Sequence, residues 1–150
     1  MLDSFDRKIL TALQSDATLS LAALSEIIGL SQSPCWKRVK RLETEGYIAD
    51  RVTLLDREKL NLGVTVFVSI RTNQHDEQWL ADFASAISEI PEVVEFYRMS
   101  GEVDYLLKIL CSGIGDYDRI YRKLIRSAKL SDVSSSFAME QIKYTTALPI

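Results

Sequence analysis

The sequence predicts an α+β protein, with a winged helix-turn-helix at the N-terminus and a ferredoxin-like βαββαβ domain after it. Three observations support this prediction. Apolar residues recur at helical spacing in the first part of the chain, they follow a strand-like alternation from Val64 onward, and Asn61, Leu62 and Gly63 separate the two regions. We therefore assign residues 1–62 to one domain with a connector, and residues 63–150 to a second domain.

The first domain opens with two short amphipathic helices. Asp3 or Ser4 suits the N-cap of the first helix and Ser20 that of the second, because their side-chain oxygens can accept hydrogen bonds from free backbone N–H groups. The second helix is predicted to end at Gly29, and only Leu30 separates this glycine from the next helix start. Such a tight connection between two helices is typical of a helix-turn-helix.

A basic helix between Ser31 and Gly46 is the most informative segment. Pro34 suits the first helical position, where no backbone donor is needed, and Gly46 suits the left-handed position after the last turn. The apolar residues fall at helical spacing and are expected to face a small core: Cys35, Val39 and Leu42. The cations project elsewhere: Lys37, Arg38, Lys40 and Arg41. A helix that is fixed on one side and cationic on the other is typical of DNA recognition.

A basic run by itself usually marks a solvated surface, so the order of the elements carries the argument for double-stranded DNA. We expect the N-terminal end of the helix, with Gln32, Ser33 and Lys37, to reach base edges, and the other cations to contact phosphates. Trp36 either packs on the flank of the helix or lies against the DNA backbone. The predicted DNA-binding residues are Ser31, Gln32, Ser33, Trp36, Lys37, Arg38, Lys40 and Arg41.

Residues 47–55 have the composition of extended chain, which predicts the wing.

The net charge of −3 does not argue against DNA binding, because the charge is unevenly divided. Residues 1–62 carry nine Lys/Arg and nine Asp/Glu, whereas residues 63–150 carry nine and twelve. The local field of the basic helix matters more for docking than the net charge does.

The second domain shows strands and helices in the order βαββαβ, that of the ferredoxin-like split βαβ unit. Strands are predicted at residues 64–71, 93–99, 103–111 and 134–145, with helices before Pro91 and from residue 115. In the third strand, Tyr105 and Leu107 point one way and Leu106 and Leu110 the other, so both faces are apolar. Helices can cover only one face, and we expect a second subunit on the other. The alternative is a contact with another domain of the same chain.

Five segments of the chain, taken together, carry a family resemblance: residues 6–10, 29–31, 34–43, 45–48 and 100–108. In their order and spacing they resemble the leucine-responsive regulator/AsnC (Lrp/AsnC) family of bacterial and archaeal transcription factors. The likeness covers nearly the whole chain. It implies a sequence-specific regulator with an AsnC-type winged helix-turn-helix, a RAM/AsnC-type effector domain, an amino acid as effector, and homodimers that often assemble into octamers.

The turn at residues 100–104 resembles the effector loop of that family, where a glycine and a following acid shape a pocket between subunits. Gly101 permits close approach of a ligand, and Asp104 offers a carboxylate to an ammonium group. The bulky residues of leucine-binding relatives are replaced here by Ser135 and Ser136, so a smaller or more polar effector is expected. A plain β-turn, in which Asp104 bonds its own backbone, is the alternative. The predicted effector-binding residues are Arg98, Ser100, Gly101, Asp104, Ile114, Ser135 and Ser136.

The sequence predicts a cytoplasmic, nucleoid-associated protein without catalytic residues, metal or cofactor. No apolar run is long enough to span a membrane, and Cys35 and Cys111 lack the spacing of a metal site. Two alternatives stay open: a nucleoid-architectural DNA-binding protein of low specificity, and an enzyme resembling the siroheme decarboxylases, which use histidine and basic residues around a tetrapyrrole. His75 is the only histidine and lies in a polar loop, which argues against the enzyme.

Overall fold

The computed structural model describes all residues except 75, 128–129 and 131, so His75, which was expected in a polar loop, lies outside the described residues. The chain forms two compact units. Unit 1 comprises Met1–Leu54 together with Ile142–Ile150, and unit 2 comprises Leu55–Gln141. The connector expected in the first domain therefore groups with the second, where Arg57 donates a 2.5 Å hydrogen bond to Thr65.

Unit 1 contains three helices: α1 (Ser4–Ser15), α2 (Leu21–Ile28) and α3 (Gln32–Thr44). The predicted caps are confirmed at Asp3, Ser20 and Gly29; Gly29 ends α2 with a φ of 77°. The helices enclose a core of Ile9, Leu24, Ile28, Cys35, Val39 and Leu42. The C-terminal segment joins this unit through Gln14, whose side-chain amide donates to the carbonyl of Leu148 (3.0 Å) and accepts from its N–H (2.9 Å).

The segment after α3, where the sequence predicts the wing, contains no regular strand. Gly46 adopts the left-handed conformation, with a φ of 76°, and residues 51–56 are without regular secondary structure. They pair with no strand, because the four described strands all belong to one sheet in unit 2. The three helices of the predicted winged helix-turn-helix are thus present, and the segment predicted as its wing is a loop without a strand.

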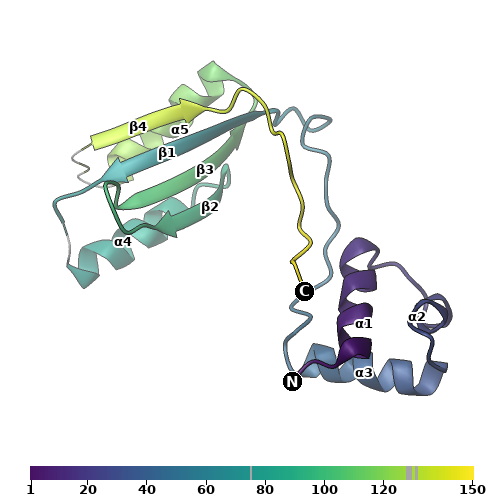
Figure 1. Ribbon diagram of the computed structural model, residues 1–150. Coiled ribbons are helices and arrows are strands. Elements are labelled where there is room, and N and C mark those ends of the chain that lie inside the picture. The colour runs from purple at the N-terminus through teal and green to yellow at the C-terminus, as the bar shows by residue number, and fades with distance from the viewer. Residues whose placement is uncertain (75, 128–129, 131) are drawn as a thin grey trace. The chain divides into compact units, whose positions relative to one another are not determined.

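Unit 2 has the predicted order βαββαβ (Figure 1). Its elements are β1 (Val64–Arg71), α4 (Glu77–Ser88), β2 (Val93–Arg98), β3 (Tyr105–Cys111), α5 (Ile114–Ser127) and β4 (Asp132–Phe137). The strands form one antiparallel sheet in the order β2-β3-β1-β4. The last strand ends at Phe137 and not at residue 145, because β4 pairs only with β1 and its pairing runs out where Phe137 meets Val66.

Both helices of unit 2 lie on the same face of the sheet (Figure 1). The alternation predicted for β3 is confirmed: Tyr105, Leu107, Ile109 and Cys111 are buried against the helices. Leu106 and Leu110 point to the other face, which we call the open face and which also carries Phe67 and Tyr97. Among the described residues, no helix is long and apolar enough to cross a membrane.

Candidate nucleic-acid and effector sites

The exposed face of α3 lies opposite its buried residues. Ser33, Trp36, Lys37 and Lys40 follow one another at the spacing of a single helical face and are all exposed, Trp36 by 50%. Trp36 is thus half-exposed and lies beside the lysines, outside the buried core of unit 1. Ser31 is the N-cap of α3, and its side chain makes no capping hydrogen bond. The helix begins at Gln32, two residues before Pro34, which was predicted at its first position. The polar groups at this end of the helix are thus available to a ligand.

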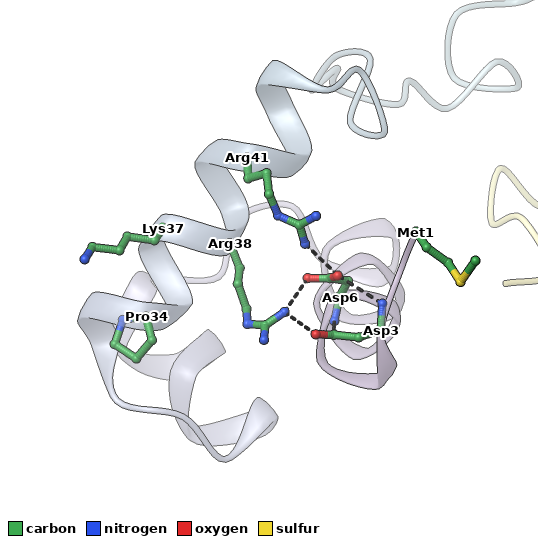
Figure 2. Close-up of a pocket in the computed structure, with 7 residues that line it drawn as sticks. All are labelled: Met1, Asp3, Asp6, Pro34, Lys37, Arg38 and Arg41. Carbon is green, nitrogen blue, oxygen red and sulfur yellow. Dashed lines mark hydrogen bonds and ion pairs between the residues drawn. The ribbon is translucent and has the colours of Figure 1, made fainter.

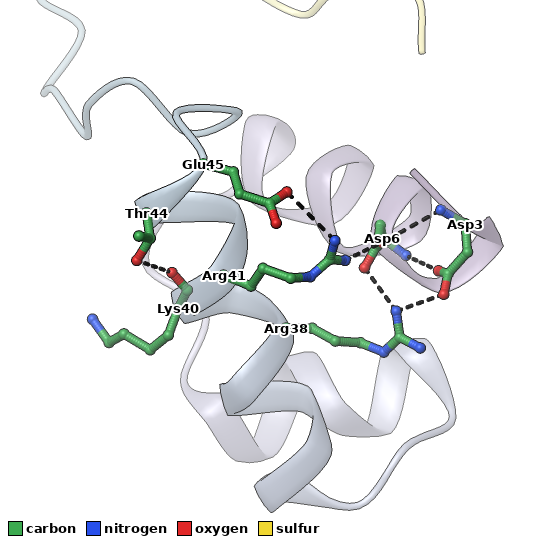
Figure 3. Close-up of polar contacts among 7 residues, drawn as sticks. All are labelled: Asp3, Asp6, Arg38, Lys40, Arg41, Thr44 and Glu45. Atoms are coloured by element: carbon green, nitrogen blue, oxygen red, sulfur yellow. Dashed lines mark hydrogen bonds and ion pairs between the residues drawn. The ribbon is translucent and has the colours of Figure 1, made fainter. Parts of the chain in front are cut away.

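Arg38 and Arg41 have partners that the sequence did not predict. Arg38 Nη1 lies 2.7 Å from Asp3 Oδ2 and 2.8 Å from Asp6 Oδ1, and Arg41 Nη2 lies 2.6 Å from Asp6 Oδ2 (Figures 2 and 3). We call these four residues the α1–α3 clamp. In this chain the two arginines bind carboxylates of α1, whereas the prediction assigned them to DNA phosphates.

The two carboxylates of the clamp also cap the N-terminus of α1. The N–H of Asp6 donates to Asp3 Oδ1 (2.9 Å) and the N–H of Asp3 donates to Asp6 Oδ2 (3.1 Å), which makes a reciprocal capping box. Asp6 is 1% exposed. Burial raises its pKa, but the hydrogen bonds from Arg41, the Asp3 backbone and Arg38 outweigh this and lower the pKa of Asp6 to about 2. Asp6 is consequently ionised at neutral pH.

A signal for this buried carboxylate is present in the sequence. Asp6 precedes Ile9, Leu10 and Leu13 by three, four and seven residues, so it lies on the apolar face of α1. A buried carboxylate needs a cation or several donors close by. The arginines that satisfy it stand 32 and 35 residues later, and their identity follows only from the packing of α3 on α1.

The lysines of α3 differ from the arginines. Lys40 pairs with Glu43 at 2.7 Å in an exposed contact of the kind that contributes little to stability. Among the described residues, Lys37 is the cation of α3 that makes no ion pair. Its side chain points away from the clamp, at the edge of an open pocket of about 480 Å³ (Figure 2). The lining residues are Met1, Asp3, Asp6, Pro34, Lys37, Arg38 and Arg41.

The predicted effector loop lies between β2 and β3. Gly101 has a φ of 130°, and a Cβ built there meets nothing within 4 Å, so its conformation and not the available space calls for glycine. The carboxylate of Asp104 accepts a 2.8 Å hydrogen bond from the N–H of Thr72, just after β1. The side chain of Asp104 thus bonds a neighbouring segment and not its own backbone, which differs from the β-turn alternative, while its carbonyl closes the turn by accepting from the N–H of Met99 (2.8 Å).

The structure brings only some of the predicted effector residues together. Arg98 and Asp104 line a small pocket of about 80 Å³ with Leu80, Met99 and Tyr105, and Ser100 and Gly101 form the adjoining turn. Ligand pockets usually measure about 300–1,000 Å³, so one chain does not by itself enclose an amino acid here.

Three predicted effector residues lie elsewhere in unit 2. Ile114 follows the far end of β3, away from Gly101. Ser135 pairs with Val68 on the helix-covered face, where its hydroxyl is hydrogen-bonded to Tyr117, whereas Ser136 lies on the open face. Neighbouring residues of a strand point to opposite faces, so these two serines cannot line the same side of the sheet.

Comparisons with known proteins agree with both halves of this description. The Lrp/AsnC ligand-binding domain matches residues 65–148, and a winged helix-turn-helix DNA-binding domain matches residues 2–49. The chain is 53% identical to the DNA-binding transcriptional activator DecR of Escherichia coli (strain K12). The alignment spans 151 residues and covers 100% of this chain and 99% of the relative.

Two solved structures have the same fold over nearly their whole length. An AsnC family transcriptional regulator from Agrobacterium tumefaciens is 55% identical, with a TM-score of 0.96 over 99% of this chain and 97% of that one. A transcriptional regulator from Neisseria meningitidis in complex with L-Met is 35% identical, with a TM-score of 0.93 over the same shares of the two chains.

Proposed function

Since the chain belongs to the Lrp/AsnC family of DNA-binding transcriptional regulators, we propose that α3 reads specific DNA sites and that an amino acid bound to unit 2 controls this activity. The exposed face of α3 is the observation that carries the proposal. The matched families and relatives are regulators and not enzymes, so the decarboxylase alternative is set aside.

The roles on α3 follow from its geometry. Ser31, Gln32 and Ser33 stand at the N-terminal end, which reaches base edges when a recognition helix enters the major groove. Lys37 and Lys40 lie further along the exposed face and suit phosphates. For Lys37 this replaces the base contact expected from the sequence, because Lys37 stands more than one helical turn beyond Gln32. Trp36 lies on the flank of the same face, where its ring is in reach of the sugar–phosphate backbone.

The two roles predict different results in a DNA-site library. Lys37→Ala should weaken binding to all sequences about equally and lower the slope of log K against log salt by about one. Gln32→Ala should instead change the base preference, by about 1–3 kcal/mol at one position. Lys59→Ala, which removes an exposed lysine outside α3, is the matched control and should change neither quantity.

Binding profiles of Lys37→Ala and Gln32→Ala that cannot be told apart would contradict the assignment. Equal, salt-sensitive recovery of every fragment by the unmodified protein would instead favour the nucleoid-architectural alternative, because a small ratio of specific to non-specific affinity distinguishes that class.

An amino acid is the effector class that unit 2 fits best. The ligand-binding family match and the similarity to an L-Met complex support it. Asp104 and Arg98 offer one charge of each sign at the same pocket, as a free amino acid with its ammonium and carboxylate groups requires. Because the pocket of one chain is small, we expect residues of a second subunit to complete it.

Asp104→Asn is the corresponding test. Asparagine keeps an oxygen for the N–H of Thr72 but removes the charge, so affinity for the effector should fall at least about tenfold, the equivalent of one lost charged hydrogen bond. A thermal-shift screen of the twenty amino acids finds the ligand. Calorimetry then compares the affinity of the unmodified protein and of Asp104→Asn for that ligand. Glu102→Gln, an exposed carboxylate of the same turn, is the control. Unchanged affinity in Asp104→Asn would rule out this site.

We expect unit 2 to form a homodimer through its open face. The helices cover the other face, and an open face with apolar side chains is a surface that a second subunit can bury. A two-fold axis would also present two copies of α3 to two DNA half-sites. Assembly of dimers into octamers is the family expectation for larger species.

A further inference from the structure

We propose that Asp3 and Asp6 withhold Arg38 and Arg41 from DNA phosphates, and that these two carboxylates are specificity-determining residues of unit 1. The inference rests on the proposed reading of DNA by α3. It assigns a role in DNA binding to two acidic side chains of α1, a helix that carries none of the predicted base contacts.

The geometry of the clamp supports this role. Arg38 and Arg41 project from the flank of the exposed face of α3, and their side chains are 28% and 37% exposed. Both are long enough to turn toward a phosphate beside Lys37 if released. Asp6 holds both guanidinium groups at once, at 2.8 and 2.6 Å, and Asp3 holds Arg38 a second time at 2.7 Å.

The charge balance of the clamp explains why this matters for specificity. Two cations and two carboxylates neutralise each other, so an approaching phosphate meets mainly Lys37 and the exposed Lys40, which shares its charge with Glu43. Phosphate contacts carry no base information and supply nearly all of the non-specific affinity. Keeping two arginines out of those contacts lowers non-specific binding more than specific binding, and thereby raises the ratio between them.

The test breaks each clamp contact from either side. Asp6→Asn and Arg41→Gln both remove the Asp6–Arg41 ion pair, but only Asp6→Asn keeps the arginine, which then retains only its longer, exposed contact with Glu45 (3.4 Å). Asp3→Asn and Arg38→Gln form a second, milder pair. For each full-length variant, affinity is measured against salt for a selected site and for an unrelated duplex. Circular dichroism and thermal unfolding report whether the unit is folded.

We expect Asp6→Asn to bind the unrelated duplex more tightly, with a salt slope steeper by about one to two, since each phosphate contact adds about 0.9. The ratio of specific to non-specific affinity should fall at least about tenfold. Arg41→Gln and Arg38→Gln should keep the unmodified slope, because their arginines do not contact phosphates. If the clamp were only structural, the Asp and Arg variants of one contact would lose equal stability. The dependence of DNA affinity on salt would then be unchanged in all four variants.

Asp50→Asn controls for the loss of one negative charge, because Asp50 is an exposed carboxylate of the same unit outside the clamp. Equal slopes in the Asp and Arg variants, or a steeper slope in Asp50→Asn as well, would overturn the inference. If Asp6→Asn does not fold, Asp3→Asn decides, because Asp3 is half-exposed and its loss leaves Arg38 with one carboxylate partner where it had two. Affinity for the unrelated duplex should then rise, by less than in Asp6→Asn, and an unchanged affinity would overturn the inference. Failure of Lys37→Ala to alter DNA binding would refute the proposed function itself and is a separate result.

Discussion

Replacing both arginines of the clamp, as Arg38→Gln with Arg41→Gln, should destabilise unit 1 by about 3 kcal/mol, the cost of leaving the buried Asp6 carboxylate without a compensating charge. Asp6 is 1% exposed and its two strongest partners come from α3, so glutamine side chains replace charged donors by weaker neutral ones. Hydrogen exchange of the α1 and α3 amides measures the loss within the intact chain.

The size of this loss should depend on pH in a defined direction. The pKa of Asp6 is lowered from 3.8 to about 2, so its contribution is present above about pH 4 and disappears as the pH falls toward 2. A shift of this size corresponds to about 2 kcal/mol. The difference in unfolding free energy between the unmodified protein and the double variant should therefore narrow between about pH 4 and pH 2.

Arg51→Ala is the matched control, because Arg51 belongs to the same unit but pairs with Glu43 in a largely exposed contact. Exposed pairs contribute about 0–1 kcal/mol, so this variant should stay close to the unmodified protein at every pH. A double clamp variant as stable as Arg51→Ala would show that the buried carboxylate finds other donors, and would contradict the role given to the clamp.

Phe67→Glu should convert the proposed homodimer to single chains. Phe67 lies on the open face of β1, opposite Lys108 of β3. A carboxylate buried there without a full partner costs several kcal/mol, and each 1.4 kcal/mol weakens association about tenfold. Phe67 is 39% exposed in the single chain, so the new carboxylate stays in water until a partner covers it, and unit 2 should stay folded. Sedimentation should then give the mass of one chain.

The control for this experiment is Ile125→Glu, which places the same charge on an exposed apolar position of α5, on the helix side of the sheet. It should leave the assembly unchanged. Dissociation by Ile125→Glu alone would place the interface on the helix side, and an undisturbed oligomer in Phe67→Glu would remove the open face from consideration. Loss of DNA affinity together with dissociation would link the two-fold assembly to binding at two half-sites.

Local chemistry made most elements of this protein predictable. The caps at Asp3, Ser20 and Gly29 are side-chain and backbone preferences of single positions, and they mark helix ends wherever they occur. The alternation in β3 likewise follows from the two-residue repeat of a strand. Because these signals act over a few residues, they indicated the helix order of unit 1 and the βαββαβ order of unit 2 without any tertiary information.

Tertiary contacts decided the roles of individual side chains and the limits of the sheet. The sequence by itself determined that α3 is basic, but only the packing of α1 on α3 decided that Asp3 and Asp6 engage Arg38 and Arg41. In the same way, β4 ends where its pairing with β1 ends, and Ser135 and Ser136 separate to two faces. These outcomes depend on groups that are distant in sequence, and a carboxylate or strand edge binds whichever partner the fold brings within reach.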